Sequence, residues 1–275
     1  MTSIVAVLSD PATARICLDA AAVAAAAAPE GEVEAFHARV KPESLIMITE
    51  EVMTDGRRAE LVALLDQKSQ AFRGIVQEWA TAHSKENPPV WNEVEGDKVE
   101  AIVAERGKMA DLVVIVRPAE HEGKEALHAA IFETGGLLLL VPPVPGTASR
   151  FGKHAAIAWK KSDQAERAVI TSIPWLKQAD RVSLLIVDEV GETQADEGMA
   201  LLDPHGIAAE PVLIDRGDDS VGVRLLRAAH EIGADCLVMG AYRHNRVVEM
   251  ILGGVTQHML RHADLPVFML HCGRR

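Results

Sequence analysis

Two groups of glycine residues near the end of the chain have the spacing of an anion-binding loop. Gly240 follows the apolar run at 236–239, and Gly253 and Gly254 open a segment with helical spacing. At the N-terminus of a helix, free backbone amides and the helix dipole favour a phosphate group. Glycine at such a place lets the backbone approach the anion without a Cβ in the way. The pattern predicts that this segment binds a phosphate chain.

Side chains next to these glycines complete a candidate binding site. Arg243 and His244 add positive charge, and Thr256 adds a hydroxyl. Trp159 and Lys160 follow another apolar run, and ligands of open parallel sheets sit beyond the carboxyl ends of the strands. The candidate nucleotide-binding residues are Trp159, Lys160, Gly240, Arg243, His244, Gly253, Gly254, Val255 and Thr256. The alternative is that the glycines are plain turns in a domain that has lost its ligand.

The last predicted helix also carries two histidines at a spacing that suits a metal ion. His258 and His262 stand at i and i+4, but the residues between them lack the glutamate that a zinc hydrolase needs. His271 and Cys272 follow, yet four converging ligands cannot be inferred from spacing alone. We interpret these residues as separate polar positions. No metal is predicted beyond Mg²⁺ accompanying a nucleotide.

The sequence contains no arrangement that is typical of a catalytic centre. It has neither a G-x-S-x-G nucleophile motif nor a Walker A loop. Asp218 and Asp219 precede a helix predicted from Val221, and we expect them to cap that helix rather than to act as an acid and a base. No catalytic residue is assigned. A binding protein is favoured over an enzyme, with weak ATP hydrolysis as the most that is expected.

The charge and composition of the chain limit its partners. A formal net charge of −12 and a pI near 5.4 disfavour nucleic acid and anionic membrane surfaces, because both need clustered Lys and Arg. An anionic ligand would bind only where local amides or basic residues override this field. The longest apolar run, residues 20–28, is too short to span a membrane. Three scattered cysteines (Cys17, Cys236 and Cys272) and no visible secretory signal predict a cytoplasmic protein with reduced thiols.

Strands and helices are predicted to alternate along the chain. In the first half, strands are expected at 4–8, 33–38, 90–93, 112–116 and 137–141, and helices at 13–27, 55–83, 98–106 and 122–133. In the second half, strands are expected at 155–159, 182–187, 210–214, 236–239 and 267–270, and helices at 164–173, 194–203, 221–232 and 251–262. Apolar strands alternating with helices are typical of an α/β fold in which helices cover both faces of a parallel sheet.

The two halves also form an internal repeat. The segment VEAIVAERGKMADLVVI at 99–115 aligns without a gap to VRLLRAAHEIGADCLVM at 223–239. A stiff proline-rich linker at 142–146 separates the copies. We therefore predict two tandem Rossmann-like domains, residues 1–145 and 151–275, each with a five-stranded parallel sheet flanked by helices.

The stretch from Gly240 to Thr256 resembles the signature of the universal stress protein A family, whose ATP-binding members carry G-x₂-G-x₉-G-[S/T]. The ending LRHADLPVFML is similar to the last helix and strand of that family. The resemblance covers nearly the whole chain as two copies and is more secure in the second half. Gly240 matches the first motif glycine and Gly253 the third. Arg243 stands at the second glycine position and Gly254 at the hydroxyl position, with Thr256 two residues further on.

The resemblance implies an adenine nucleotide alpha hydrolase-like fold with ATP or a related nucleotide in the second half. It also implies an Asp after the first strand of a binding domain. Asp10 has that place in the first half, which lacks the glycine loop, whereas the second-half loop carries its acid later, at Asp163. Neither half has the full set. Because final strands pair across a dimer in the family, residues 137–141 are expected to pair with 267–270 inside this chain, and a homodimer remains open.

Two classes of function follow from these patterns. The first is a stress-response binding module that holds a nucleotide in its second half. The second is a scaffold that binds no nucleotide and acts through protein contacts. The long amphipathic helix at 55–83 bears on this choice, because its apolar stripe packs either on its own sheet, which we expect, or on a partner. The stripe consists of Leu61, Leu64, Leu65, Phe72, Ile75, Val76 and Trp79.

Overall fold

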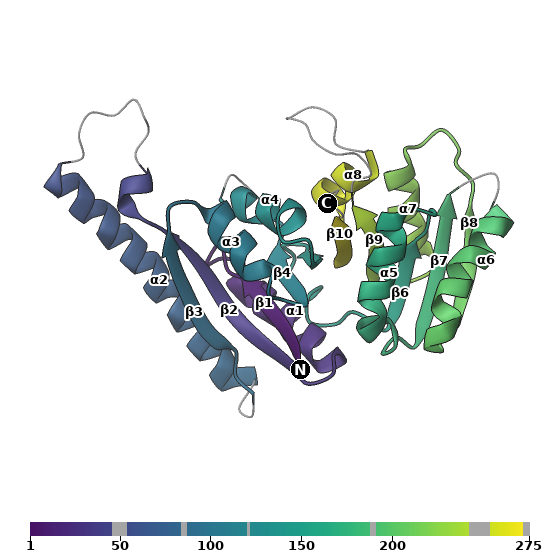
Figure 1. The fold of residues 1–275 in the computed structure, drawn as a ribbon, viewed down its shortest axis with the longest axis horizontal. Coiled ribbons are helices and arrows are strands. Elements are labelled where there is room, and N and C mark those ends of the chain that lie inside the picture. Colours follow the sequence, from purple (N-terminus) through teal and green to yellow (C-terminus); the bar gives the residue numbers. More distant parts are fainter. Residues whose placement is uncertain (46–53, 84–86, 120–121, 188–190, 242–253, 272–275) are drawn as a thin grey trace.

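Apolar strands and helices alternate through the structure, a computed structural model that describes residues 1–45, 54–83, 87–119, 122–187, 191–241 and 254–271 (Figure 1). The strands are β1 (Thr2–Val7), β2 (Gly31–Val40), β3 (Val90–Gly96), β4 (Leu112–Val116), β5 (Leu137–Val141), β6 (His154–Ala158), β7 (Arg181–Val187), β8 (Ala209–Ile214), β9 (Cys236–Ala241) and β10 (Val267–His271). The helices are α1 (Ala14–Ala27), α2 (Asp55–His83), α3 (Val99–Gly107), α4 (Lys124–Phe132), α5 (Asp163–Leu176), α6 (Gly191–Leu202), α7 (Val221–Glu231) and α8 (Gly254–His262). Short 3₁₀ turns, η1 (Pro42–Leu45) and η2 (Asp203–His205), were not predicted.

All ten strands join in one sheet, with the order β3-β2-β1-β4-β5-β10-β9-β6-β7-β8. The order 3-2-1-4-5 of the first half thus recurs in reverse across the molecule. Pairing within each half is parallel. The predicted α/β fold of two five-stranded parallel halves is confirmed.

The two halves meet at the pair β5–β10, which is antiparallel (Figure 1). Leu140 lies opposite Val267, Leu139 opposite Phe268, and Leu137 opposite Leu270. These side chains are almost completely buried, because helices cover the sheet on both faces here. The predicted pairing of the two final strands inside one chain is confirmed.

Two hydrophobic layers cover the sheet. Buried residues of α1, α2, α5 and α6 form one layer, and those of α3, α4, α7 and α8 form the other. Across the seam, the indole Nε1 of Trp175 in α5 donates to the carbonyl oxygen of Ala24 in α1 at 3.0 Å. Small alanine side chains such as Ala20 and Ala21 let α1 lie close to the strands, and both are fully buried.

The long helix α2 packs against the outer strands of the first half. Phe72, Val76 and Trp79 are buried, which confirms that its apolar stripe faces the chain's own sheet over this part. The stripe was also predicted to include Leu64, and that is wrong because this side chain is 62% exposed. The helix begins at Asp55, but the hydroxyl of Thr54, not Asp55, accepts the capping hydrogen bond from the amide of Arg57.

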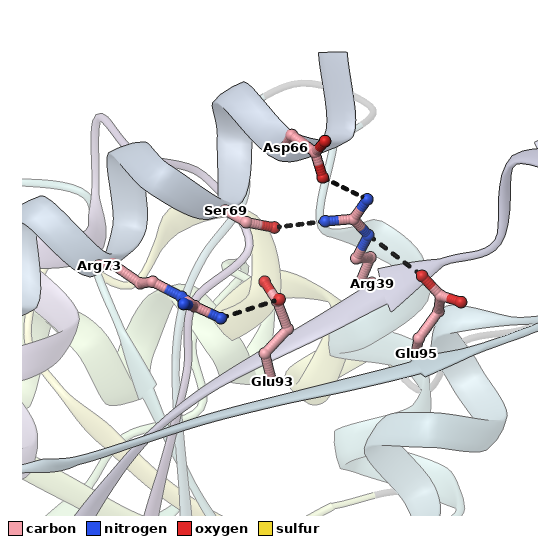
Figure 2. A network of polar contacts seen from close by, with 6 residues as sticks. All are labelled: Arg39, Asp66, Ser69, Arg73, Glu93 and Glu95. Carbon is pink, nitrogen blue, oxygen red and sulfur yellow. Dashed lines mark hydrogen bonds and ion pairs between the residues drawn. The ribbon is translucent and has the colours of Figure 1, made fainter. Parts of the chain in front are cut away.

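A polar network holds α2 against the sheet (Figure 2). Arg39 of β2 donates to Asp66 at 2.7 Å and to Ser69 at 3.3 Å, both on α2, and pairs with Glu95 of β3 at 3.2 Å. The Arg39 side chain is 13% exposed, so water competes little for its guanidinium. A second pair joins Arg73 of α2 to Glu93 of β3.

We expect Arg39→Met to weaken the attachment of α2. The methionine keeps an apolar stem, but Asp66, Ser69 and Glu95 lose a shared donor. Because both carboxylates are half exposed, the free energy of unfolding should fall by only about 1 kcal/mol. Urea denaturation followed by circular dichroism measures the change. Arg57→Met, which removes an exposed arginine paired with Glu60, is the control and should change little.

The described part of the chain holds no helix that is both long enough and apolar enough to cross a lipid bilayer. Cys17 and Cys236 are buried free thiols, and Cys272 lies outside the described residues. Burial raises the pKa of the Cys17 thiol to about 12 and also raises the pKa of Cys236. Both thiols therefore stay protonated at neutral pH and behave as small core residues.

Candidate functional site

A cavity of about 310 Å³ lies at the carboxyl ends of β6, β7 and β9 in the second half. Its lining residues are Ala158, Trp159, Lys160, Lys161, Ser162, Gln164, Ala165, Val187, Val221, Leu225, Met239, Gly240, Ala241, Gly254, Val255 and Thr256. Six of the residues predicted for the site thus come together here: Trp159, Lys160, Gly240, Gly254, Val255 and Thr256. The other three, Arg243, His244 and Gly253, lie outside the described residues.

Gly240 is needed for the packing of this site. A Cβ at this position would lie 2.8 Å from the backbone nitrogen of Ala165 and 2.8 Å from the carbonyl carbon of Gln164. Backbone atoms cannot move away as a flexible side chain can, so only glycine allows the end of β9 to touch the start of α5. From the sequence, this glycine was predicted to let the backbone come close to an anion. The structure gives it the further role of bringing a helix N-terminus to the cavity.

Two helices start at the cavity. Ser162 is the N-cap of α5, and its hydroxyl accepts from the amide of Ala165 at 3.2 Å. Helix α8 starts at Gly254, where an added Cβ would have no neighbour within 4 Å among the residues that the structure describes. The first amides of a helix have no partner inside the helix, so both starts offer donors to an anion. Thr256, which was predicted to offer its hydroxyl, lines the cavity but is only 4% exposed.

The described lining of the cavity is positively charged, although the chain carries a net charge of −12. It includes Lys160 and Lys161 and no carboxylate. A hydrogen bond from Lys161 to Glu197 raises the pKa of this lysine. Lys160 is exposed and forms no ion pair within the part of the chain that the structure describes. The acid expected in this loop, Asp163, is exposed at the start of α5 and does not line the cavity.

The cavity also has an apolar wall, which was not predicted from the sequence. Val187, Val221, Leu225 and Met239 supply it. These residues stand at the ends of predicted strands or in the first turns of a predicted helix, so their positions at the carboxyl edge of the sheet were the available signal. Trp159, which was predicted as a binding residue, is only 4% exposed and packs largely into the core.

The corresponding region of the first half is built differently. Extending the gapless repeat by one residue places Val116 at the position of Gly240, and this valine is buried. Gly123, with φ of 85°, packs against Ser9, whose Cβ lies 3.0 Å from the place of an added Cβ. Asp10, the acid implied by the family resemblance, accepts from the backbone amide two residues later at 2.8 Å. This carboxylate therefore stabilises its own loop.

The prediction for the N-cap of α7 is wrong. Asp218 and Asp219 were expected to cap α7, but Ser220 is the N-cap, and its hydroxyl accepts from the amide of Val223 at 3.4 Å. Asp219 instead accepts from Arg227 at 2.9 Å. Serine is as good an N-cap as aspartate and stands one residue closer to the helix.

The two histidines of α8 lie side by side. The rings of His258 and His262 are 4.7 Å apart, and no group of three or more metal ligands occurs among the described residues. Burial and the neighbouring His262 lower the pKa of His258. His258 also packs tightly on α7, because a Cβ at Gly222 would lie 2.6 Å from its Cβ.

A second cavity of about 290 Å³ lies at the seam, near the amino ends of β6 and β9. Its lining is mostly apolar and comes from both halves, including Ala27, Trp175, Cys236 and Phe268. It contains none of the residues predicted for the site. Parallel sheets bind ligands at the carboxyl ends of their strands, so the first cavity is the better functional candidate.

The structure is an α/β fold of two five-stranded halves, with a cavity at the carboxyl ends of the strands in the second half. Residues 153–271 match the model of the Universal stress protein family. The whole chain is similar in fold to a universal stress protein from Archaeoglobus fulgidus DSM 4304, with a TM-score of 0.70, 15% identity and 98% of each chain covered. It is also similar to a protein from Pseudomonas aeruginosa UCBPP-PA14 assigned as a universal stress protein, with a TM-score of 0.57, 13% identity, and coverage of 98% of this chain and 93% of that chain.

A comparison of the sequence with curated proteins gave no match. The second half of the chain is thus a domain of the universal stress protein family, and the fold of the whole chain is similar to that of the two solved structures.

Proposed function

We propose that this universal stress protein is a stress-response binding module of the cytoplasm that holds one adenine nucleotide, such as ATP, in the cavity of its second half. The observation that carries the proposal is the local charge of that cavity. In a chain with a net charge of −12, the described lining has two lysines and no carboxylate. A locally positive electrostatic potential in an otherwise acidic protein favours an anionic ligand.

The residues present fit a nucleotide. The amides at the starts of α5 and α8, together with Lys160, would hold the phosphates, and the phosphate oxygens would carry any accompanying Mg²⁺. The apolar wall that includes Leu225 and Met239 would receive the base and the ribose. In the first half the buried Val116 stands at the position of Gly240, so we expect one nucleotide per chain.

Gly254 allows a direct test with a matched pair of variants. A side chain at this position meets no atom of the described residues within 4 Å of its Cβ, so the fold should tolerate Gly254→Glu and Gly254→Gln equally. The glutamate places a negative charge at the start of α8 and should weaken ATP binding at least about tenfold by repulsion, whereas the glutamine should weaken it much less. Isothermal titration calorimetry with Mg-ATP measures both dissociation constants.

The result also separates the proposal from the scaffold alternative. If the unmodified protein binds no nucleotide at millimolar concentration, the nucleotide proposal fails and a protein that acts through contacts alone is favoured. Equal affinities of the two Gly254 variants for Mg-ATP would indicate that the nucleotide binds outside this cavity. The observation that keeps the scaffold as the second candidate is that Asp10 of the first half stabilises its own loop.

A further inference from the structure

The two helices that line one side of the cavity are anchored at their far ends. The first turns of α7 and α8 contribute Val221, Gly254, Val255 and Thr256 to the cavity lining. The last turns of α7 and α8 lie away from the cavity, on the side where the first half contacts the second half across the seam. The position of these last turns therefore affects the shape of the cavity wall.

Arg117, directly after β4 of the first half, reaches the end of α8. Its Nη1 donates to the carbonyl oxygen of Ala263 at 2.7 Å. The amide of Ala263 in turn donates to the carbonyl oxygen of Met259 at 3.0 Å, so Ala263 closes the last turn of the helix. A guanidinium at this place satisfies a free carbonyl and matches the negative end of the helix dipole. Partial burial lowers the pKa of Arg117, and the carboxylate of Asp264 opposes this shift.

The last turn of α7 contacts the same segment after α8. His230, in the last turn of α7, lies 2.9 Å through Nε2 from Oδ1 of Asp264. Nearer the cavity, Gly222 of α7 and His258 of α8 are in close contact. The two helices are therefore joined at both ends, and Arg117 links this pair to the first half.

We propose that Arg117 is a positioning residue through which the first half holds the α7–α8 wall of the nucleotide cavity in the second half. The proposal rests on the proposed nucleotide function for its effect on affinity. The matching position of the repeat in the second half is Ala241, so only the first copy carries this arginine. The first half, which carries the buried Val116 in place of Gly240, thus contributes a structural support to the site of its neighbour.

The experiment compares Arg117→Ala, Arg117→Lys and Arg15→Ala in the full chain. Arg15 is a half-exposed arginine that pairs with Glu78 within the first half, which makes it the matched control. Without the guanidinium, the end of α8 loses its donor and the helix start shifts or becomes more mobile. We expect Arg117→Ala to raise the dissociation constant for Mg-ATP about tenfold, Arg117→Lys to recover part of the loss, and Arg15→Ala to bind like the unmodified protein.

Hydrogen exchange on the nucleotide-free protein gives a second reading that does not need the ligand. Arg117→Ala should speed exchange in 254–262 and 221–231, while α3 and α4 of the first half keep their protection. Unchanged exchange in α8 overturns the proposal, and so does unchanged affinity if the unmodified protein binds ATP. If the unmodified protein binds no nucleotide, the function proposed above fails, and exchange alone then decides whether Arg117 positions this wall.

Discussion

Replacing Gly240 by valine, the residue at the matching position of the first half, is expected to lower the free energy of unfolding by about 3 kcal/mol. The reason is steric, because even a Cβ at this position would lie 2.8 Å from backbone atoms of Ala165 and Gln164. The start of α5 must then move away from β9. That movement also displaces Ser162 and the amides that line the cavity, so nucleotide binding should be lost together with stability.

Urea denaturation of the Gly240→Val protein measures the loss of stability, and calorimetry with Mg-ATP measures the loss of binding. Gly254→Ala is the matched control for stability, since an added Cβ there has no neighbour within 4 Å and alanine favours a helix over glycine. A Gly240→Val protein as stable as the unmodified one would show that α5 can move at little cost, contrary to the packing argument.

The second large effect is expected at the seam between the halves. Phe268 is 2% exposed, and its ring centroid lies 5.6 Å from that of Trp175 and 6.1 Å from that of Phe151. Its strand β10 pairs Phe268 with Leu139 of β5 in the first half. Phe268→Ala removes a large core side chain in a place where the surrounding sheet cannot collapse, so the free energy of unfolding should fall by about 3–5 kcal/mol.

The change at the seam has a second consequence for cooperativity. One continuous sheet predicts that both halves of the unmodified protein unfold in a single transition, and a weakened seam should separate that transition into two. Circular dichroism and tryptophan fluorescence against urea concentration report this separation. Met109→Ala, at a side chain that is 63% exposed, is the control and should leave the curve unchanged. A stability loss below about 1 kcal/mol for Phe268→Ala would contradict the packing of the seam, since that is less than burial of the ring contributes.

Much of the fold could be predicted because local patterns and burial agree along this chain. The apolar runs that became β4 and β5 are buried on both faces, and their limits match the prediction. The repeat between 99–115 and 223–239 follows from residue types alone, and the pairing of β5 with β10 followed from the family resemblance. Six of the nine predicted site residues line one cavity for the same reason, since each stands at a carboxyl end of a strand or a start of a helix.

The features that were not predicted depend on contacts between distant segments. The pairing of Asp219 with Arg227, eight positions away, is one such contact, whereas the N-cap Ser220 stands directly before the predicted helix and was a local signal. The apolar wall with Leu225 and Met239 arises only when β9 and α7 are packed together. The contact of Arg117 with Ala263 spans 146 positions in the chain.

By itself, the sequence determined the repeated α/β architecture, the pairing of the halves and the half in which a site should be sought. Hydrophobic periodicity and glycine spacing suffice for the architecture and for the choice of half, because they act through burial and local backbone geometry, whereas the pairing of the halves was implied by the family resemblance. The tertiary structure decided why Gly240 must be glycine, which side chains form the wall of the cavity, and how Arg117 connects the first half to it. Those properties depend on distances between chain segments that only the folded sheet and its helices bring together.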